Sequence, residues 1–278
     1  MAKYEYQLIP GFFVQDDHAY SATHQIVPSF GLLNPTDPDR WAEFKKKVAA
    51  LHEGVKARGA GFVKVFFVGR HGQGWHNLAA AKYGREEWDT KWCKLNGDGE
   101  ITWGPDPELT PQGIQEAKNA SEAWKKELPH GMPLPNRWFA SPFQRASNTL
   151  RITFDGVVAD PKPLIIEEIR EMIGMHTCDK RSPKRTIQER FPTFSIEEGF
   201  TEEDELWKPD YRETEGEMVV RAARGLDKIM ELTDVDDVYI SISAHTGIAR
   251  ALMAAVGHRR YDLPTGGVLP MVVSVTRT

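Results

Sequence analysis

An arginine, a histidine and a glycine stand together at Arg70, His71 and Gly72, directly after the apolar run 63–68. A run of β-branched and aromatic residues is typical of a buried strand, and open α/β sheets place their reactive groups at the carboxyl ends of such strands. Arginine has a planar fork of donors that suits phosphate, imidazole is a good nucleophile, and glycine lets the backbone approach a ligand closely. The tripeptide therefore indicates a site for an anionic substrate. Taken alone it fits a surface histidine beside a salt-bridged arginine equally well, because short motifs also arise by chance.

Two later segments repeat this arrangement. Arg145 falls in the first turn of a helix that we expect after a short strand at 136–140, with Ser141 as the N-cap of that helix. His245 follows the β-rich run 238–244 and precedes another helical segment. Each residue alone has an ordinary interpretation, as an exposed helical arginine or as a core histidine. If the three strand ends met at one crevice, two arginines and two histidines would form a local basic cluster in a chain whose net charge is −5.

Further polar residues lie close to these motifs. Asn77 follows the first histidine by six residues, in a segment expected to form a helix over 75–82. The amino end of a helix carries unpaired N–H groups and a partial positive charge, so it favours phosphate. Four residues could line the substrate side of the same crevice, although a surface or salt-bridged position is the more ordinary interpretation of each: His76, His176, Asp179 and Arg181.

Taken together, these motifs resemble the histidine phosphatase superfamily, in particular its phosphoglycerate mutase-like branch. The matching segments follow the family's order and approximate spacing from about Val63 to the carboxyl terminus: Arg70-His71-Gly72 with Asn77, Leu109-Thr110-Pro111-Gln112-Gly113, Ser141-Pro142-Phe143-Gln144-Arg145-Ala146, and Ala244-His245-Thr246-Gly247 with Arg250. The stretch 170–179 is similar to a fungal-type subgroup. The acid phosphatase and phytase branch is disfavoured, because Gln73-Gly74-Trp75 follows the first glycine and Thr246 follows the second histidine.

The resemblance implies a role for each matching residue. His71 would be the nucleophile that becomes phosphohistidine. Arg70, Arg145 and a cationic His245 would hold the phosphoryl oxygens, and Asn77 would add a polar contact. Fixed cations and N–H donors in a dry pocket stabilise charge on a transferring phosphoryl group. The site would then need neither a metal nor another cofactor.

The general acid would be a glutamate in the segment 163–171. Glu171 matches the family best, because it completes the sequence Ile169-Arg170-Glu171. Gly174 follows it by three residues where the family spacing is usually four, so Glu168 is the alternative. The ordinary interpretation of both glutamates is a solvated helix face.

Alternating strand and helix patterns predict an α/β fold, a three-layer sandwich with a mostly parallel central sheet and helices on both faces. We expect one domain over 1–278, with 1–60 as an amino-terminal extension and insertions near 84–109 and 174–213. Strands are expected near 62–68, 136–140, 163–166, 238–244 and 268–276, and helices near 39–56, 75–82, 111–127, 142–152, 214–232 and 246–256. Long loops at the carboxyl face usually carry specificity.

Composition narrows the class of protein. The chain has 278 residues, of which 40% are hydrophobic and 27% charged, as in ordinary globular proteins. Two cysteines do not suggest a disulfide framework, and no apolar run reaches the length of a membrane span. No basic block indicates nucleic acid or membrane as a partner. We therefore expect a cytoplasmic, possibly nucleocytoplasmic, protein whose partner is a small phosphorylated substrate, while its oligomeric state is left open.

The favoured function is a metal-independent phosphatase that hydrolyses a phosphate ester of a small metabolite through phosphohistidine. Phosphoglycerate mutase-type transfer is an alternative, but it needs extra cations, and Arg212 stands alone at the corresponding place. A non-catalytic phospho-ligand-binding protein is a third possibility. The run His176-Thr177-Cys178-Asp179 has no second ligand pair at zinc spacing, so its role is left open.

Overall fold

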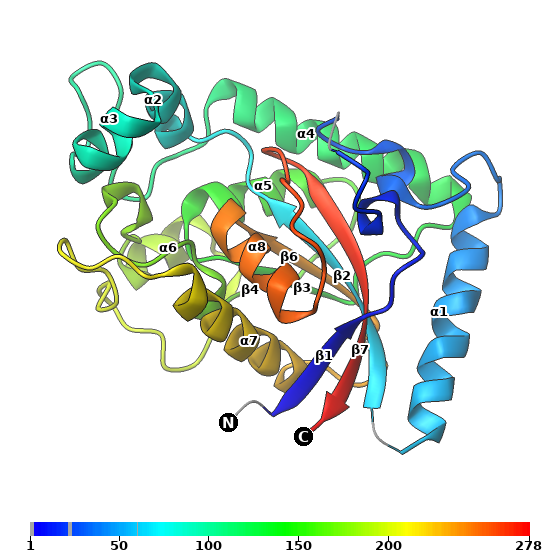
Figure 1. Ribbon diagram of the computed structural model, residues 1–278. Coiled ribbons are helices and arrows are strands. Elements are labelled where there is room, and N and C mark those ends of the chain that lie inside the picture. Colours follow the sequence, from blue (N-terminus) through cyan, green and yellow to red (C-terminus); the bar gives the residue numbers. More distant parts are fainter. Residues whose placement is uncertain (1–2, 22–23, 60) are drawn as a thin grey trace.

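A computed structural model of the protein describes residues 3–21, 24–59 and 61–278. Within these residues, seven strands form one sheet in the order β1-β7-β2-β6-β3-β4-β5 (Figure 1). Their bounds are β1 Tyr4–Leu8, β2 Gly61–Arg70, β3 Arg137–Ala140, β4 Leu164–Ile165, β5 Ser195–Ile196, β6 Tyr239–Ala244 and β7 Val268–Arg277. Strands β2, β6, β3, β4 and β5 run parallel, whereas β7 is antiparallel to both β2 and β1. The predicted mostly parallel sheet is confirmed.

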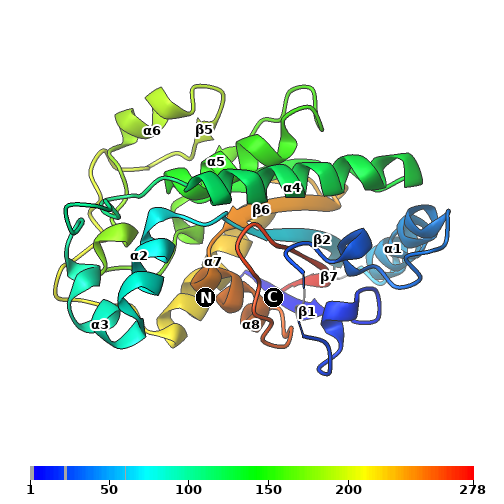
Figure 2. The same cartoon turned by 90° about the horizontal axis from the view of Figure 1, so that it is seen from above.

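Helices cover both faces of the sheet, with α4 and α5 on one side and α7 and α8 on the other (Figure 2). The α-helices are α1 Arg40–Ala57, α2 Trp75–Tyr83, α3 Arg85–Thr90, α4 Pro111–Glu127, α5 Gln144–Phe154, α6 Lys184–Arg190, α7 Glu215–Glu231 and α8 Thr246–Ala255. Short 3-10 turns are η1 Val14–Asp16, η2 Pro28–Gly31, η3 Trp92–Lys94, η4 Leu128–His130, η5 Glu167–Ile169 and η6 Thr177–Asp179.

The central strand β2 is buried on both faces, and this gives the fold its three layers. Its side chains alternate between two cores: Val65 and Phe67 pack with α1, α4 and α5, whereas Phe66 and Val68 pack with α7 and α8. A strand buried on both faces reads as a continuous apolar run, as the sequence shows here. An apolar face of α1 is also buried, with Trp41 in the same core as Phe67.

Two helices begin at threonine caps. Thr110 caps α4 by accepting a hydrogen bond from the Gly113 N–H, and Thr214 caps α7 by accepting one from the Glu217 N–H. The expected N-cap at Ser141 is wrong, because α5 begins at Gln144 and its N-cap residue is Phe143. The Ser141 side chain is instead used inside the site described below.

Several elements lie outside the expected pattern. The amino-terminal segment contributes β1, which pairs with β7, so part of the extension over 1–60 belongs to the sheet. The expected insertions hold short elements, α3 and η3 in 84–109 and η6, α6 and β5 in 174–213. These elements are too short to show a clear periodicity. None of the helices in the described ranges combines the length and the apolar character that a membrane crossing requires.

Candidate active site

Three parallel strand ends bring the predicted residues to one edge of the sheet. Arg70, the last residue of β2, is in register with Ala244, the last residue of β6, and the His71 N–H donates to the Ala244 carbonyl at 3.0 Å. The rings of His71 and His245 consequently lie next to each other, with 4.9 Å between their centroids. On the other side of β6, the N–H of Ser141 donates to the Ser243 carbonyl at 2.9 Å.

His71 is oriented as a nucleophile would be. Its side chain is buried, and its Nδ1 lies 2.6 Å from the carbonyl oxygen of Gly72. A carbonyl only accepts hydrogen bonds, so Nδ1 carries the proton and Nε2 keeps its lone pair. Burial, together with the charges of Arg145 and Arg70, holds the pKa of His71 well below 6.5. The imidazole is therefore neutral near pH 7 and able to attack an electrophile.

His245 lies at the N-cap position of α8 and is fully buried. Its Nε2 is 2.7 Å from the Ser141 hydroxyl oxygen, and its ring packs against Phe143 with 5.2 Å between centroids. Burial lowers the pKa of His245 well below 6.5, and Arg145 and His71 act in the same direction. The cationic form that we expected for His245 is therefore disfavoured in this structure. An anion bound among these side chains would raise the pKa of His245.

Arg145 is almost fully buried, with its guanidinium 4.4 Å from the centre of the Phe143 ring. Its Nη1 donates to the Cys178 carbonyl at 2.9 Å and its Nη2 to the Asp179 carboxylate at 3.1 Å. Its Nε is buried and has no hydrogen-bond partner in the described part of the chain. Two of its nitrogens therefore hold the guanidinium in place, and a third has an N–H to offer a ligand.

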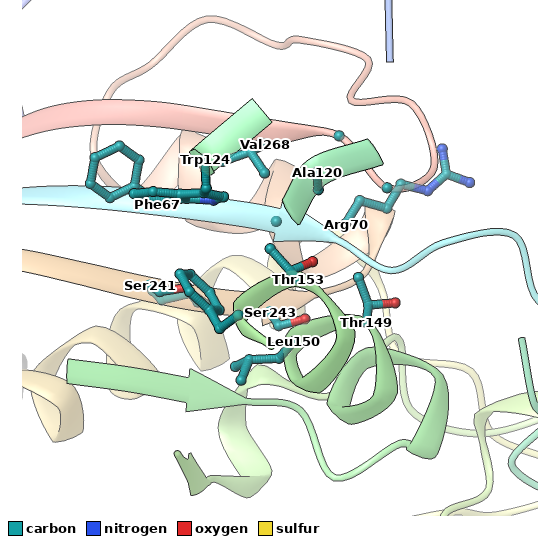
Figure 3. A pocket seen from close by; sticks show the side chains of 15 residues that line it. Phe67, Arg70, Ala120, Trp124, Thr149, Leu150, Thr153, Ser241, Ser243 and Val268 are labelled. Carbon is teal, nitrogen blue, oxygen red and sulfur yellow. The ribbon is translucent and has the colours of Figure 1, made fainter. Parts of the chain in front are cut away.

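Arg70 is half-buried and reaches away from the sheet. Its Nη1 donates to the Leu263 carbonyl at 2.9 Å, while its Nε is buried without a partner among residues 3–21, 24–59 and 61–278. Arg70 also borders a cavity of about 30 Å³ behind the strand ends, beside Thr149 and Ser243 (Figure 3). Neither His71 nor His245 lines this cavity, so Arg70 is its one contact with the four predicted site residues Arg70, His71, Arg145 and His245.

Asn77 and Gly72 make contacts with the backbone that the sequence did not predict. The Asn77 carbonyl oxygen accepts the Gly74 N–H at 2.9 Å and so closes the start of α2. A Cβ on Gly72 would lie 2.2 Å from the Gly113 carbonyl oxygen. We expected Gly72 to let the backbone approach a ligand closely. In the structure it lets the backbone approach α4 closely instead.

Glu171 and Glu168 lie in different surroundings. The Glu171 carboxylate accepts hydrogen bonds from the N–H groups of Gly247 at 2.9 Å and Ile248 at 3.2 Å, in the first turn of α8. Glu168 instead pairs with Lys228 of α7 at 2.7 Å. Because α8 starts directly after His245, the geometry favours Glu171 over Glu168 as the residue next to the candidate site.

Two residues of the site were only weakly indicated by the sequence. The His76 ring lies 5.3 Å from the His71 ring, between centroids. Asp179, from the predicted insertion, binds Arg145 through Oδ1 and Arg212 through Oδ2, the latter at 2.9 Å. Its position could not be predicted because a long loop carries it to the site.

A possible metal-ligand group overlaps this region. The ligand atoms of His176, Cys178 and Asp179 all lie within 4.8 Å of one another. However, two guanidinium groups already bind the Asp179 carboxylate, and burial raises the pKa of the Cys178 thiol well above 9.0. Nearby cations and a protonated thiol make this group poorly suited to a metal ion.

Comparisons with known proteins agree with this geometry. Residues 68–268 match the histidine phosphatase superfamily (branch 1). The chain is 37% identical to the "Probable phosphoglycerate mutase" of Arthroderma benhamiae, over 97% of this chain and 84% of that protein. It is 36% identical to the "Probable phosphoglycerate mutase PMU1" of Saccharomyces cerevisiae, over 76% of this chain and 79% of that protein.

The fold is also found among solved structures. The crystal structure of phosphoglycerate mutase from Bacillus anthracis aligns with a TM-score of 0.50 at 16% identity, covering 79% of this chain and 94% of that chain. This level of identity supports the fold alone. The chain belongs to the histidine phosphatase superfamily, and its fungal relatives are phosphoglycerate mutase-like proteins.

Proposed function

We propose that this protein is a metal-independent phosphatase that hydrolyses a phosphate ester of a small metabolite. The observation that carries the proposal is the His71 imidazole, which is neutral, buried and fixed through Nδ1 so that Nε2 is free. Arg70 and Arg145 each have an unpartnered Nε–H within the described residues. These donors suit the oxygens of a phosphoryl group beside the nucleophile.

The reaction would proceed in two displacements. The His71 Nε2 attacks phosphorus, the P–N bond forms and the P–O bond to the leaving group breaks, while Glu171 gives a proton to the departing oxygen. The deprotonated carboxylate then takes a proton from water, whose oxygen attacks phosphorus and breaks the P–N bond. Inorganic phosphate and the starting enzyme result, so atoms and protons balance. Splitting the displacement in this way is the usual advantage of covalent catalysis.

A cavity of about 280 Å³ lies beside the residues that hold Glu171. It is lined by Met172 and Gly247, whose N–H groups both bind the Glu171 carboxylate, and by Met218 of α7 and Arg250 of α8. Neither His71 nor His245 lines it, so the proposal of a small phosphorylated metabolite rests on the phosphoryl site alone. A cytoplasmic location is likewise a prediction.

Phosphoglycerate mutase activity is the second candidate, because fungal relatives carry that name. Such a transfer must hold a carboxylate and a second phosphate. Arg212, the cation considered for this task, already donates through Nη1 to Asp179 and to the Gly174 carbonyl at 2.7 Å. Arg212 is a single cation that is partly neutralised by Asp179, whereas transfer needs extra cations, and this favours hydrolysis over transfer.

The test compares the wild-type protein with H71A on 4-nitrophenyl phosphate, with and without EDTA. We expect the wild type to release phosphate in the presence of EDTA and H71A to lose several powers of ten in kcat, since removal of a nucleophile is that costly. A coupled assay with 3-phosphoglycerate measures the mutase alternative. If H71A kept more than about a tenth of the wild-type rate, the nucleophile assignment would be wrong.

A further inference from the structure

His76 is the third histidine at the strand ends, and its position is unusual for a residue at the start of a helix. It is the second residue of α2, and its ring lies over Gly74, where an added Cβ would meet its Nδ1 at 2.7 Å. The glycine thereby makes room for the imidazole. The ring also lies near that of His71, with 5.3 Å between centroids and 52° between planes.

The Nδ1 atom of His76 is buried and has no hydrogen-bond partner within the described ranges. A buried polar atom without a partner is costly, so native proteins leave few of them. One explanation for such an atom beside a nucleophile is that its partner is a ligand. Because the His76 ring lies next to the His71 ring, such a ligand would lie near the proposed nucleophile.

The electrostatic surroundings of His76 favour an anion. Burial and the charge of Arg145 hold the pKa of His76 well below 6.5, and His71, Arg70 and His176 act in the same direction. The neutral imidazole still offers one N–H donor, which is the form that other active sites use to polarise an oxygen.

We propose that His76 is a phosphate-binding residue that donates an N–H hydrogen bond to an oxygen of the transferring phosphoryl group. The inference rests on the proposed phosphatase function, because it assigns a contact within that reaction. His76 thus adds a donor to those offered by Arg70 and Arg145. The contact is of the kind that strengthens as charge develops in the transition state.

The experiment uses H76A, H76N and H76Q in the full-length protein, with exposed His18 changed to asparagine as a matched control. The probes are turnover of 4-nitrophenyl phosphate and inhibition by orthovanadate, which resembles a phosphoryl group in transit. We expect H76A to lower kcat by about 100-fold, the effect of losing one well-placed donor, and to weaken inhibition by orthovanadate by about tenfold. H18N is expected to match the wild type in both.

The two conservative variants identify the nitrogen that acts. The amide nitrogen of asparagine can occupy the position of Nδ1, whereas that of glutamine corresponds to Nε2. Because Nδ1 is the buried unpaired atom, H76N should recover part of the activity lost in H76A, and H76Q should recover less. This ordering would not arise if the ring only filled space.

Two results would overturn the assignment. The first is H76A with kcat and vanadate inhibition within about threefold of the wild type. The second is an equal loss in all three variants with unchanged vanadate inhibition, which would indicate a structural role. If the wild type itself showed no turnover, the proposed function would fail, and calorimetry of inorganic phosphate binding to the wild type and H76A would still decide the contact: equal affinities would overturn it.

Discussion

The Glu171 carboxylate caps the helix that begins directly after His245. It accepts the N–H groups of Gly247 and Ile248, the residues two and three positions beyond the histidine. Glu171 therefore has a structural task, to support the turn that holds His245, and under the proposed function it has a second task, to supply a proton to the leaving group. The first depends on its shape and its acceptors, and the second on its ability to lose a proton.

The variant E171Q separates these tasks, because glutamine keeps the shape and one acceptor oxygen but cannot act as an acid. Proton donation matters most for a basic leaving group. We therefore expect turnover of glycerol phosphate to fall by about 100-fold or more and that of 4-nitrophenyl phosphate by about tenfold or less. Steady-state assays with both esters measure the ratio. If turnover of the two esters fell by the same factor, Glu171 would cap α8 but would not be the proton donor.

Asp179 links Arg145 to Arg212, and this link makes a second prediction. Removing its charge in D179N leaves Arg145 buried without its carboxylate. Breaking a buried ion pair costs about 3 kcal/mol of stability, and a misplaced guanidinium should raise KM for a phosphate ester more than it lowers kcat. Thermal unfolding and steady-state kinetics measure the two effects.

The control for D179N is D236N, which breaks an exposed pair with Lys56 instead. An exposed ion pair contributes at most about 1 kcal/mol, so D236N should leave both stability and kinetics nearly unchanged. Equal behaviour of the two variants would show that Asp179 does not position Arg145.

The sequence predicts those residues of the site that lie at the ends of strands. His71 and His245 could be placed side by side because each follows a buried run, and parallel strands end at the same edge of a sheet. Asp179 could not be placed, since no periodicity tells where a long loop returns to the sheet. The amino-terminal strand β1 was missed because five residues with alternating burial are a weak signal near a chain end.

The burial of His71 has a consequence for the pH dependence of turnover. Its pKa is held well below 6.5 by burial, with Arg145 and Arg70 acting in the same direction. A histidine attacks only in its neutral form, so the rate falls when the pH drops through the pKa of the nucleophile. We expect kcat/KM to stay high as the pH falls through 6.5 and to decline only at a lower pH.

This profile is measured from pH 4 to 8 with two esters whose own phosphate groups titrate at different pH values. A decline that moves with the ester belongs to the substrate, whereas one that stays fixed belongs to the enzyme. A fixed decline centred at or above pH 6.5 would contradict the neutral, buried state of His71.

The contact between Gly72 and Gly113 gives the last prediction. A Cβ on Gly113 would lie 2.1 Å from the Gln73 carbonyl oxygen, so an alanine there must push α4 away from the loop that carries His71. Overpacking of this kind costs about 1–3 kcal/mol, and displacement of the nucleophile should lower kcat as well. Gly216 of α7 provides the matched control, because a Cβ there meets nothing within 4 Å. We expect urea unfolding to show G113A destabilised and G216A unchanged or more stable by up to about 1 kcal/mol. If G113A were as stable and as active as G216A, the backbone contact would not be what positions His71.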